Sequence, residues 1–391
     1  MDNAKKNVAV LAACQALLLT NNSTAIAMSG LAGWALASNK ALATLPVTAW
    51  VVGGALSTFP MSLLMKRYGR RAGFTVGALI GMVGAALCSY ALYLANFWLL
   101  CLGSMVFGVY TAAAQYYRFA AADAASVEFR AQAISLVLAG GLLGGLVGPE
   151  LSKFTIDILA TRYLGAYLSL IGFLALAVGV IQLLDIPSPA SDDRRAAARP
   201  LREIVAQPVF IVAVLGAAIG YGVMNLLMTA TPLAMGLCGH PYSAAATVIG
   251  WHVVGMFAPS FFTGSLIQRF GVLQVMTAGA LLLYVVVAIA LSGISVAHFW
   301  LALVLLGIGW NFLYIGGTTL LSGACSPAER AKTQGANDSI IFLTMMITSF
   351  GSGVLIDAKG WQVLNWLALP FITVAAGAVL WLLARRRAAA A

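Results

Sequence analysis

The stretch SLLMKRYGRR, residues 62–71, decides the fold, because a second copy of its first part occurs far along the chain. The copy is GSLIQRFG at residues 264–271, which aligns with SLLMKRYG without a gap. This one offset also aligns a second pair of loops. It pairs Arg67 with Arg269, Gly69 with Gly271, Gln132 with Gln334 and Arg130 with Lys332. A single register that matches two separate loops indicates a duplicated unit, as in many secondary transporters.

The composition identifies the environment of this duplicated unit. Of the 391 residues 61% are hydrophobic and only 9% are charged, and the mean hydropathy is +0.94. A soluble protein of this length carries far more charge, whereas apolar stretches of about 20 residues are typical of helices that cross a bilayer. We therefore predict an all-α membrane protein with twelve transmembrane helices, at residues 8–31, 42–65, 72–94, 97–117, 131–154, 164–184, 207–231, 245–268, 273–293, 297–320, 334–357 and 362–384.

A polar segment that contains proline and charges of both signs follows the sixth expected span. Such a segment is typical of a linker. It divides the chain into an N-terminal six-helix half at residues 1–184, a cytoplasmic linker at 185–206 and a C-terminal six-helix half at 207–391. The repeated loops predict that pseudo-symmetry relates the two halves.

The basic residues give the orientation of the helices. All but four of the 22 Lys and Arg residues lie in loops or chain ends on one side of the membrane. The four exceptions are Lys40, Lys153, Arg162 and Lys359. The positive-inside rule assigns the basic side, with both termini, to the cytoplasm, and it explains the net charge of +10. We expect a multi-pass membrane protein in contact with the lipid bilayer and without a nucleic-acid partner.

The opening stretch resembles the loop signature of the major facilitator superfamily, Gly-x-x-x-Asp-Arg-x-Gly-Arg-Arg, between helices two and three. Ser62 replaces the glycine and Lys66 replaces the aspartate, while the other signature positions match. The resemblance implies the major facilitator fold and alternating access. It also implies that these loops gate the transporter, through Arg67, Gly69, Arg70, Arg71, Arg269 and Gly271. Simple topology signals for membrane insertion are the alternative interpretation of the arginines.

Two pairs of side chains with soft donor atoms lie in neighbouring expected spans. Met224 and Met228 are four residues apart, and so are His252 and Met256, so each pair shares one helix face. Thioether sulfur with imidazole suits Cu(I), whereas zinc or iron would recruit thiolate or carboxylate. A histidine inside a membrane span is by default a candidate functional residue. The alternative is ordinary packing around a hydrogen-bonded core histidine.

The same two motifs, MNLLM at 224–228 and HVVGM at 252–256, resemble those of the CcoA-type copper importers. That branch of the superfamily supplies copper for the assembly of haem–copper oxidases. The resemblance implies a secondary-active importer of the bacterial inner membrane, expected to be monomeric, that carries copper as substrate and holds no cofactor. The alternative is an importer of riboflavin, or an exporter of another organic solute, since riboflavin-type importers belong to the same branch.

Four further residues are candidates for supporting roles. Cys238 and His240 lie in an expected outer loop, where they would capture copper, although a plain turn before Pro241 explains them as well. Glu150 and Asp338 lie within expected spans, where ionisable groups often relay protons, and solvated helix ends are the alternative.

No catalytic motif appears in the sequence. It has no P-loop, no dinucleotide fingerprint followed by an acid and no nucleophile elbow, and its five cysteines form no CxxC pair. We therefore predict that the protein is not an enzyme.

Overall fold

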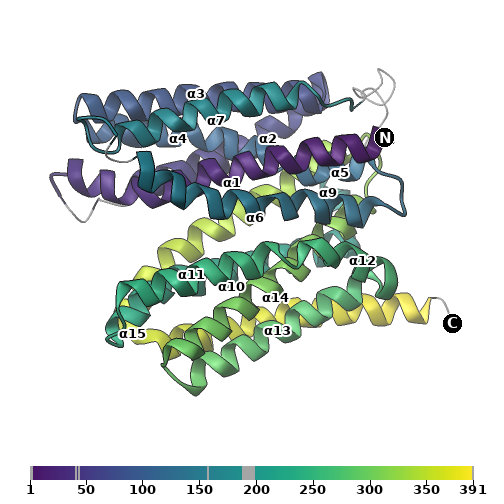
Figure 1. The fold of residues 1–391 in the computed structure, drawn as a ribbon. Helices are drawn as coiled ribbons and strands as arrows, with labels where there is room; N and C mark the ends of the chain where they lie inside the picture. Colours follow the sequence, from purple (N-terminus) through teal and green to yellow (C-terminus); the bar gives the residue numbers. More distant parts are fainter. Residues whose placement is uncertain (1–2, 40–41, 43–44, 156–157, 187–198, 390–391) are drawn as a thin grey trace. The chain divides into compact units, whose positions relative to one another are not determined.

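The computed structural model describes residues 3–39, 42, 45–155, 158–186 and 199–389. In this part of the chain the long regular elements are all helices (Figure 1). They are α1 (Asn3–Leu36), α2 (Leu45–Tyr68), α3 (Arg70–Tyr93), α4 (Phe97–Ala114), α5 (Tyr117–Ala124), α6 (Arg130–Thr155), α7 (Leu164–Ile181), α9 (Leu201–Val205), α10 (Pro208–Leu237), α11 (Tyr242–Phe257), α12 (Ser260–Phe270), α13 (Val272–Ser292), α14 (Val296–Ser322) and α15 (Arg330–Ala388).

The prediction of an all-helical membrane protein is confirmed. Ten of the described helical stretches are long and apolar enough to cross a membrane. The two other expected spans are α11 with α12, interrupted at Ala258 and Pro259, and the part of α15 before Gly360. In α15 the break lies at Gly360, whose φ of 76° separates two consecutive helices. Between α11 and α12 it lies at Pro259, because a proline removes a backbone donor from a helix. The fourth span also differs from the prediction, because α5 extends it beyond a break after α4.

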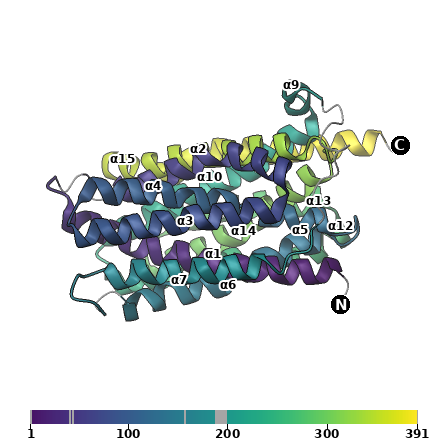
Figure 2. The ribbon, with the colours of Figure 1, turned by 90° about the horizontal axis from the view of Figure 1, so that it is seen from above.

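The helices form two compact units, and we describe each by itself. Unit 1 consists of Met1–Ser126, Gly140–Ala198 and Pro327–Phe342. Within it α3 packs against both α4 and α7, and α4 also packs against α2 (Figure 2). The α2–α4 contact requires glycine, because a methyl group on Gly108 would overlap the carbonyl oxygen of Trp50.

Unit 2 consists of Val127–Ala139, Arg199–Ser326 and Leu343–Ala391. Within it α14 packs against α10, α11 and α13 (Figure 1). The α11–α14 crossing again depends on a glycine, since a methyl group on Gly307 would overlap the backbone of His252 and Met256.

These units differ from the sequence halves at two helix ends. The first turns of α15 belong to unit 1, and the first turns of α6 belong to unit 2. Residues 187–198, most of the expected linker at 185–206, lie outside the described residues, and part of its remainder folds as α9. The halves at 1–184 and 207–391 remain a prediction from the sequence.

The sequence repeat is also visible in the backbone. Gly69, between α2 and α3, has φ 89° and ψ 165°, and Gly271, between α12 and α13, has φ 95° and ψ 150°. This conformation is essentially restricted to glycine. The two matched loops therefore require glycine at the same position for the same steric reason.

Candidate substrate site and gating network

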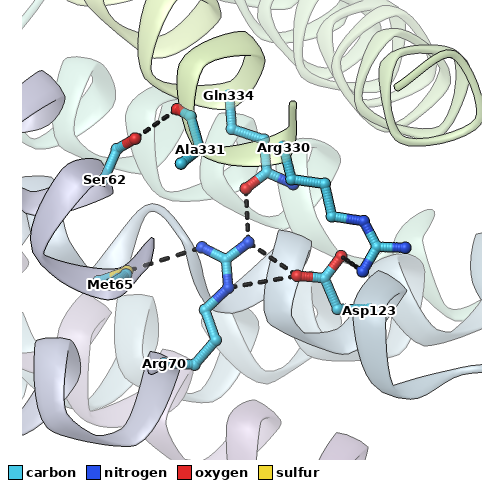
Figure 3. A network of polar contacts seen from close by, with 7 residues as sticks. All are labelled: Ser62, Met65, Arg70, Asp123, Arg330, Ala331 and Gln334. Atoms are coloured by element: carbon cyan, nitrogen blue, oxygen red, sulfur yellow. Dashed lines mark hydrogen bonds and ion pairs between the residues drawn. The ribbon is translucent and has the colours of Figure 1, made fainter. Parts of the chain in front are cut away.

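A network of polar side chains lies where the α2–α3 loop meets the first turns of α15 within unit 1 (Figure 3). Arg70 donates to Asp123 Oδ2 through its Nη2 at 2.7 Å and its Nε at 3.2 Å. The same Nη2 donates to Gln334 Oε1 at 2.5 Å. Ser62 donates its hydroxyl to the carbonyl of Ala331 beside them.

Asp123 joins the two basic ends of this network. Arg330 Nη1, in the first turn of α15, lies 3.0 Å from Asp123 Oδ1, so one carboxylate pairs with two guanidinium groups. The side chains are 12% (Arg70), 14% (Asp123) and 27% (Arg330) exposed, so solvent screens these pairs only in part. The Asp123 carboxylate of α5 thus holds both the α2–α3 loop and α15.

A second ion pair lies deeper in unit 1. Arg118 of α5 pairs with Asp338 of α15, and both side chains are only 2% exposed. Asn337 Nδ2 donates to the same Asp338 oxygen at 2.7 Å, and Arg118 also donates to the carbonyl and side-chain oxygens of Gln115. Asp338 is therefore buried and charge-paired rather than a solvated helix end. Glu150, in contrast, is exposed.

The other residues predicted to gate make different contacts. Arg71 donates to Gln182 Oε1 from α3 to the chain just after α7, at 2.9 and 3.1 Å. Arg67 and Arg269 each lie over the ring of the following aromatic residue, at 5.2 and 5.3 Å from its centroid. Of the predicted arginines, Arg70 is the one in the network that holds α15.

Unit 2 contains a neutral counterpart of this network. Gln132, in the first turns of α6, donates to Ser265 Oγ at 3.3 Å and to Gln268 Oε1 at 2.9 Å in α12. Ser135 donates to the carbonyl of Ser260 and accepts from the backbone N–H of Gly264. Arg130 Nη1, in the first residue of α6, also donates to the carbonyl of Ser322 at 3.5 Å. The start of α6 is therefore held mainly by hydrogen bonds between uncharged groups, whereas the start of α15 is held by ion pairs.

The four residues of the expected copper site all lie in unit 2. Met224 on α10 and His252 and Met256 on α11 are buried, and Met228 is half-buried. His252 Nδ1 lies 2.7 Å from the carbonyl oxygen of Leu303. A carbonyl oxygen only accepts, so Nδ1 carries the hydrogen and Nε2 is an acceptor in the neutral ring. Nε2 is buried and has no hydrogen-bond partner among the described residues.

An aromatic cluster lies on α10, α11 and α14. Trp310 of α14 stacks on Tyr314 with centroids 4.9 Å apart and an interplanar angle of 18°. Tyr221 of α10 meets both rings edge to face at 5.4 Å, and Phe257 of α11 meets Trp310 at 5.8 Å. Trp310 is 2% exposed, and its indole N–H is a buried donor without a partner in the described chain. The cluster therefore packs aromatic rings around one buried donor that has no partner in the described chain.

The expected capture residues are placed less favourably. His240 Nε2 lies 2.7 Å from the carbonyl oxygen of Ile294, so this nitrogen is a donor and not a metal ligand. Cys238 is half-buried directly after α10. Copper capture by this pair remains an untested prediction.

Sequence reasoning missed Arg118, Asp123 and the Trp310 cluster. Asp123 had a usable signal, since it is one of only 12 acidic residues in a basic chain. Trp310 had none, because one tryptophan in an apolar span is ordinary.

Comparison with known proteins identifies the family. The profile described as Major Facilitator Superfamily matches residues 9–257 and 238–391. The chain belongs to the Major Facilitator Superfamily. The superfamily resemblance inferred from the α2–α3 loop is thus confirmed, and the family consists of transporters rather than enzymes.

Three curated relatives are similar over most of their length. The riboflavin transporter RfnT of Brucella anthropi is 41% identical over 374 residues, covering 95% of this chain and 94% of the relative. The uncharacterized MFS-type transporter YddS of Bacillus subtilis is 29% identical over 92% of this chain and 87% of its own. YdeG of the same organism, also uncharacterized, is 31% identical over 83% of this chain and 80% of its own.

Solved structures agree on the fold. The transporter FucP in an outward conformation matches with a TM-score of 0.75 at 18% identity, covering 95% of this chain and 98% of FucP. The human organic anion transporter MFSD10 matches with a TM-score of 0.76 at 15% identity, covering 96% and 99%. The name of the 41% identical relative refers to riboflavin rather than copper, so it does not support the CcoA-type resemblance and it matches the stated alternative.

Proposed function

We propose that the protein is a secondary-active transporter that moves riboflavin into the cytoplasm by alternating access. The observation that carries this proposal is the 41% identity to the riboflavin transporter RfnT over 95% of the chain. The aromatic cluster of unit 2 supports it, because stacked aromatic side chains recognise planar ring systems. The protein acts as a monomer in the bacterial inner membrane, with both termini in the cytoplasm and no cofactor.

In this proposal the networks at the first turns of α15 and α6 are formed in a closed state of the transporter and are broken in the state that is open toward the cytoplasm. Ion pairs hold the start of α15 in unit 1, and hydrogen bonds mainly between uncharged groups hold the start of α6 in unit 2. Opening toward the cytoplasm requires that these contacts break, so their strength sets the population of the closed state. Protonation of Asp338, the partner of Arg118, would couple such a change to protons. Glu150 is the weaker candidate for this role because it is exposed.

Copper import is the second candidate function, and one specific observation favours it. His252 Nε2 is buried and carries a lone pair that has no partner in the described chain. The buried thioether of Met256 lies on the same helix, α11, and that of Met224 lies on α10. Imidazole and thioether are the donors that Cu(I) prefers. In this version Met228 and Met224 receive the ion from outside, and His252 and Met256 complete its coordination. The copper then serves the assembly of haem–copper oxidases.

Uptake into a riboflavin-auxotrophic bacterium that expresses the chain separates the two functions. We expect saturable uptake of radiolabelled riboflavin and no uptake of radioactive copper above the empty-vector level. Copper uptake without riboflavin uptake, abolished by His252→Ala and Met224→Ala, would replace the first proposal with the second. Uptake of neither would reject both cargoes and leave a superfamily transporter for another solute.

A further inference from the structure

The two units contain the same helix crossing, and it fixes which residues occupy equivalent places. In unit 1 a methyl group on Gly108 would overlap Trp50, Gly53 and Gly54. In unit 2 a methyl group on Gly307 would overlap the backbone of His252, Gly255 and Met256. The sequence repeat pairs these three residues with Trp50, Gly53 and Gly54. Gly108 of α4 and Gly307 of α14 are therefore equivalent positions.

The two units carry different side chains at the position three residues after these glycines, which is about one helix turn further along. Unit 1 has Thr111, and unit 2 has Trp310. In unit 1 Trp50 Nε1 donates to Thr111 Oγ1 at 3.0 Å, and Thr111 donates in turn to Asn22 Oδ1 at 3.2 Å. This chain of hydrogen bonds is closed, since each group has found a partner in the protein.

The equivalent groups of unit 2 are left open. His252 takes the place of Trp50, and Trp310 takes the place of Thr111. His252 Nε2 is an acceptor and Trp310 Nε1–H is a donor, and both are buried without a partner among the described residues. Each such group loses its hydration on folding, at a cost of about 1–3 kcal/mol. A ligand that supplies one acceptor and one donor from a planar edge removes that penalty.

We propose that this open pair, with the rings of Tyr221 and Tyr314, binds the fused ring of the transported flavin. The inference rests on the proposed riboflavin function and assigns its binding residues. The flavin ring carries two carbonyl groups that flank an imide N–H on one edge. Trp310 Nε1–H donates to a carbonyl, His252 Nε2 accepts from the imide, and Tyr221 offers its ring for stacking.

The test combines protein variants with a modified ligand. Purified wild-type protein is titrated with riboflavin, and with riboflavin methylated on the imide nitrogen, by following flavin fluorescence, which stacking on aromatic rings quenches. His252→Asn removes the Nε2 acceptor while its amide replaces the donor to Leu303. We expect methylation to weaken binding to the wild type about tenfold and to change binding to His252→Asn little, because one hydrogen bond is at stake.

Substitutions in the aromatic cluster give an independent readout. Trp310→Phe keeps a ring and removes the donor, and Tyr221→Leu removes a ring that Tyr221→Phe preserves. We expect the dissociation constant to rise about tenfold in the first two variants and to stay near the wild-type value in the third. Trp251→Leu is the matched control, since Trp251 is 49% exposed in the same unit.

The outcomes separate this inference from the proposed function. If the wild type binds riboflavin but the methylation penalty is the same in His252→Asn, and Trp310→Phe binds normally, the assigned site is wrong while riboflavin transport stands. If the wild type does not bind riboflavin, the function itself fails. Size-exclusion profiles of each variant verify that the fold is retained.

Discussion

The substitution Asp123→Asn tests whether the ion pairs at the start of α15 set the conformational equilibrium. Asp123 is the one carboxylate that Arg70 and Arg330 share in this network, and asparagine keeps its shape while removing its charge. Exposed ion pairs contribute about 0–1 kcal/mol, and breaking buried ones costs about 3–5 kcal/mol. These pairs are 12–27% exposed, so we assign about 1 kcal/mol to each and about 2 kcal/mol to both.

A loss of about 2 kcal/mol from the closed state raises the open population about thirtyfold. The assay places a cysteine at Ala331, which is 8% exposed and whose carbonyl remains available to Ser62. Cys238 and Cys325, the half-buried cysteines, are replaced by serine, and the three buried ones remain. The labelling rate with a polar maleimide then reports the open population, and we expect it to rise about thirtyfold in Asp123→Asn.

The matched control is Asp185→Asn in the same unit. Asp185 accepts from Asn3 at an exposed site, and the backbone groups of Asp185 that bond Asn7 survive the substitution. Its labelling rate should equal that of the wild type. Equal rates in Asp123→Asn and Asp185→Asn would show that the ion pairs do not hold α15, and the gating argument would fail.

Of three further predictions, the first two concern stability, measured as the melting temperature of purified protein, and the third concerns riboflavin binding. Asp338→Leu should destabilise the protein by about 3 kcal/mol, because it leaves the Arg118 guanidinium buried without its carboxylate partner. The double variant Arg118→Leu, Asp338→Leu should recover most of this loss. Equal melting temperatures of the single and double variants would contradict the prediction. Gly69→Ala and Gly271→Ala should each lower the free energy of unfolding by about 1–3 kcal/mol, because both glycines have a positive φ. Gly172→Ala in α7 is the control and should be neutral, because a methyl group there meets open space. Three equal melting temperatures would refute the strain argument. Gly307→Ala should separate α11 from α14 and abolish riboflavin binding, with Gly250→Ala as the unhindered control that must bind normally.

The spans were predictable because a bilayer leaves few choices. Every backbone polar group must be satisfied within a helix, so length and apolar composition alone mark the spans. The breaks were less predictable, since Pro259 interrupts its span whereas Pro60 lies inside a continuous α2. A proline's effect depends on which neighbours satisfy the groups it leaves free, and the sequence does not contain that information.

The network around Asp123 was predictable in part. The resemblance to the superfamily loop signature identified Arg70. The repeated loop identified both glycines, because a backbone conformation that only glycine adopts leaves a mark in the sequence. The partners of Arg70 were not predictable, because Lys66 occupies the usual acidic position and the carboxylate comes from Asp123 on α5 instead. Pairing between remote helices depends on their packing, which periodicity within one helix does not report.

The copper and flavin hypotheses converge on one feature of the fold. The same backbone crossing exists in both units, yet unit 1 closes its polar chain through Trp50, Thr111 and Asn22. Unit 2 leaves His252 Nε2 without a partner in the described chain, and a lone pair of this kind accepts either an imide hydrogen or a soft cation. Trp310 distinguishes them, because an indole N–H only donates and cannot bind a cation through its nitrogen. A copper site gains nothing from that donor, whereas a carbonyl-bearing ring gains a hydrogen bond, so the unpartnered indole favours the flavin.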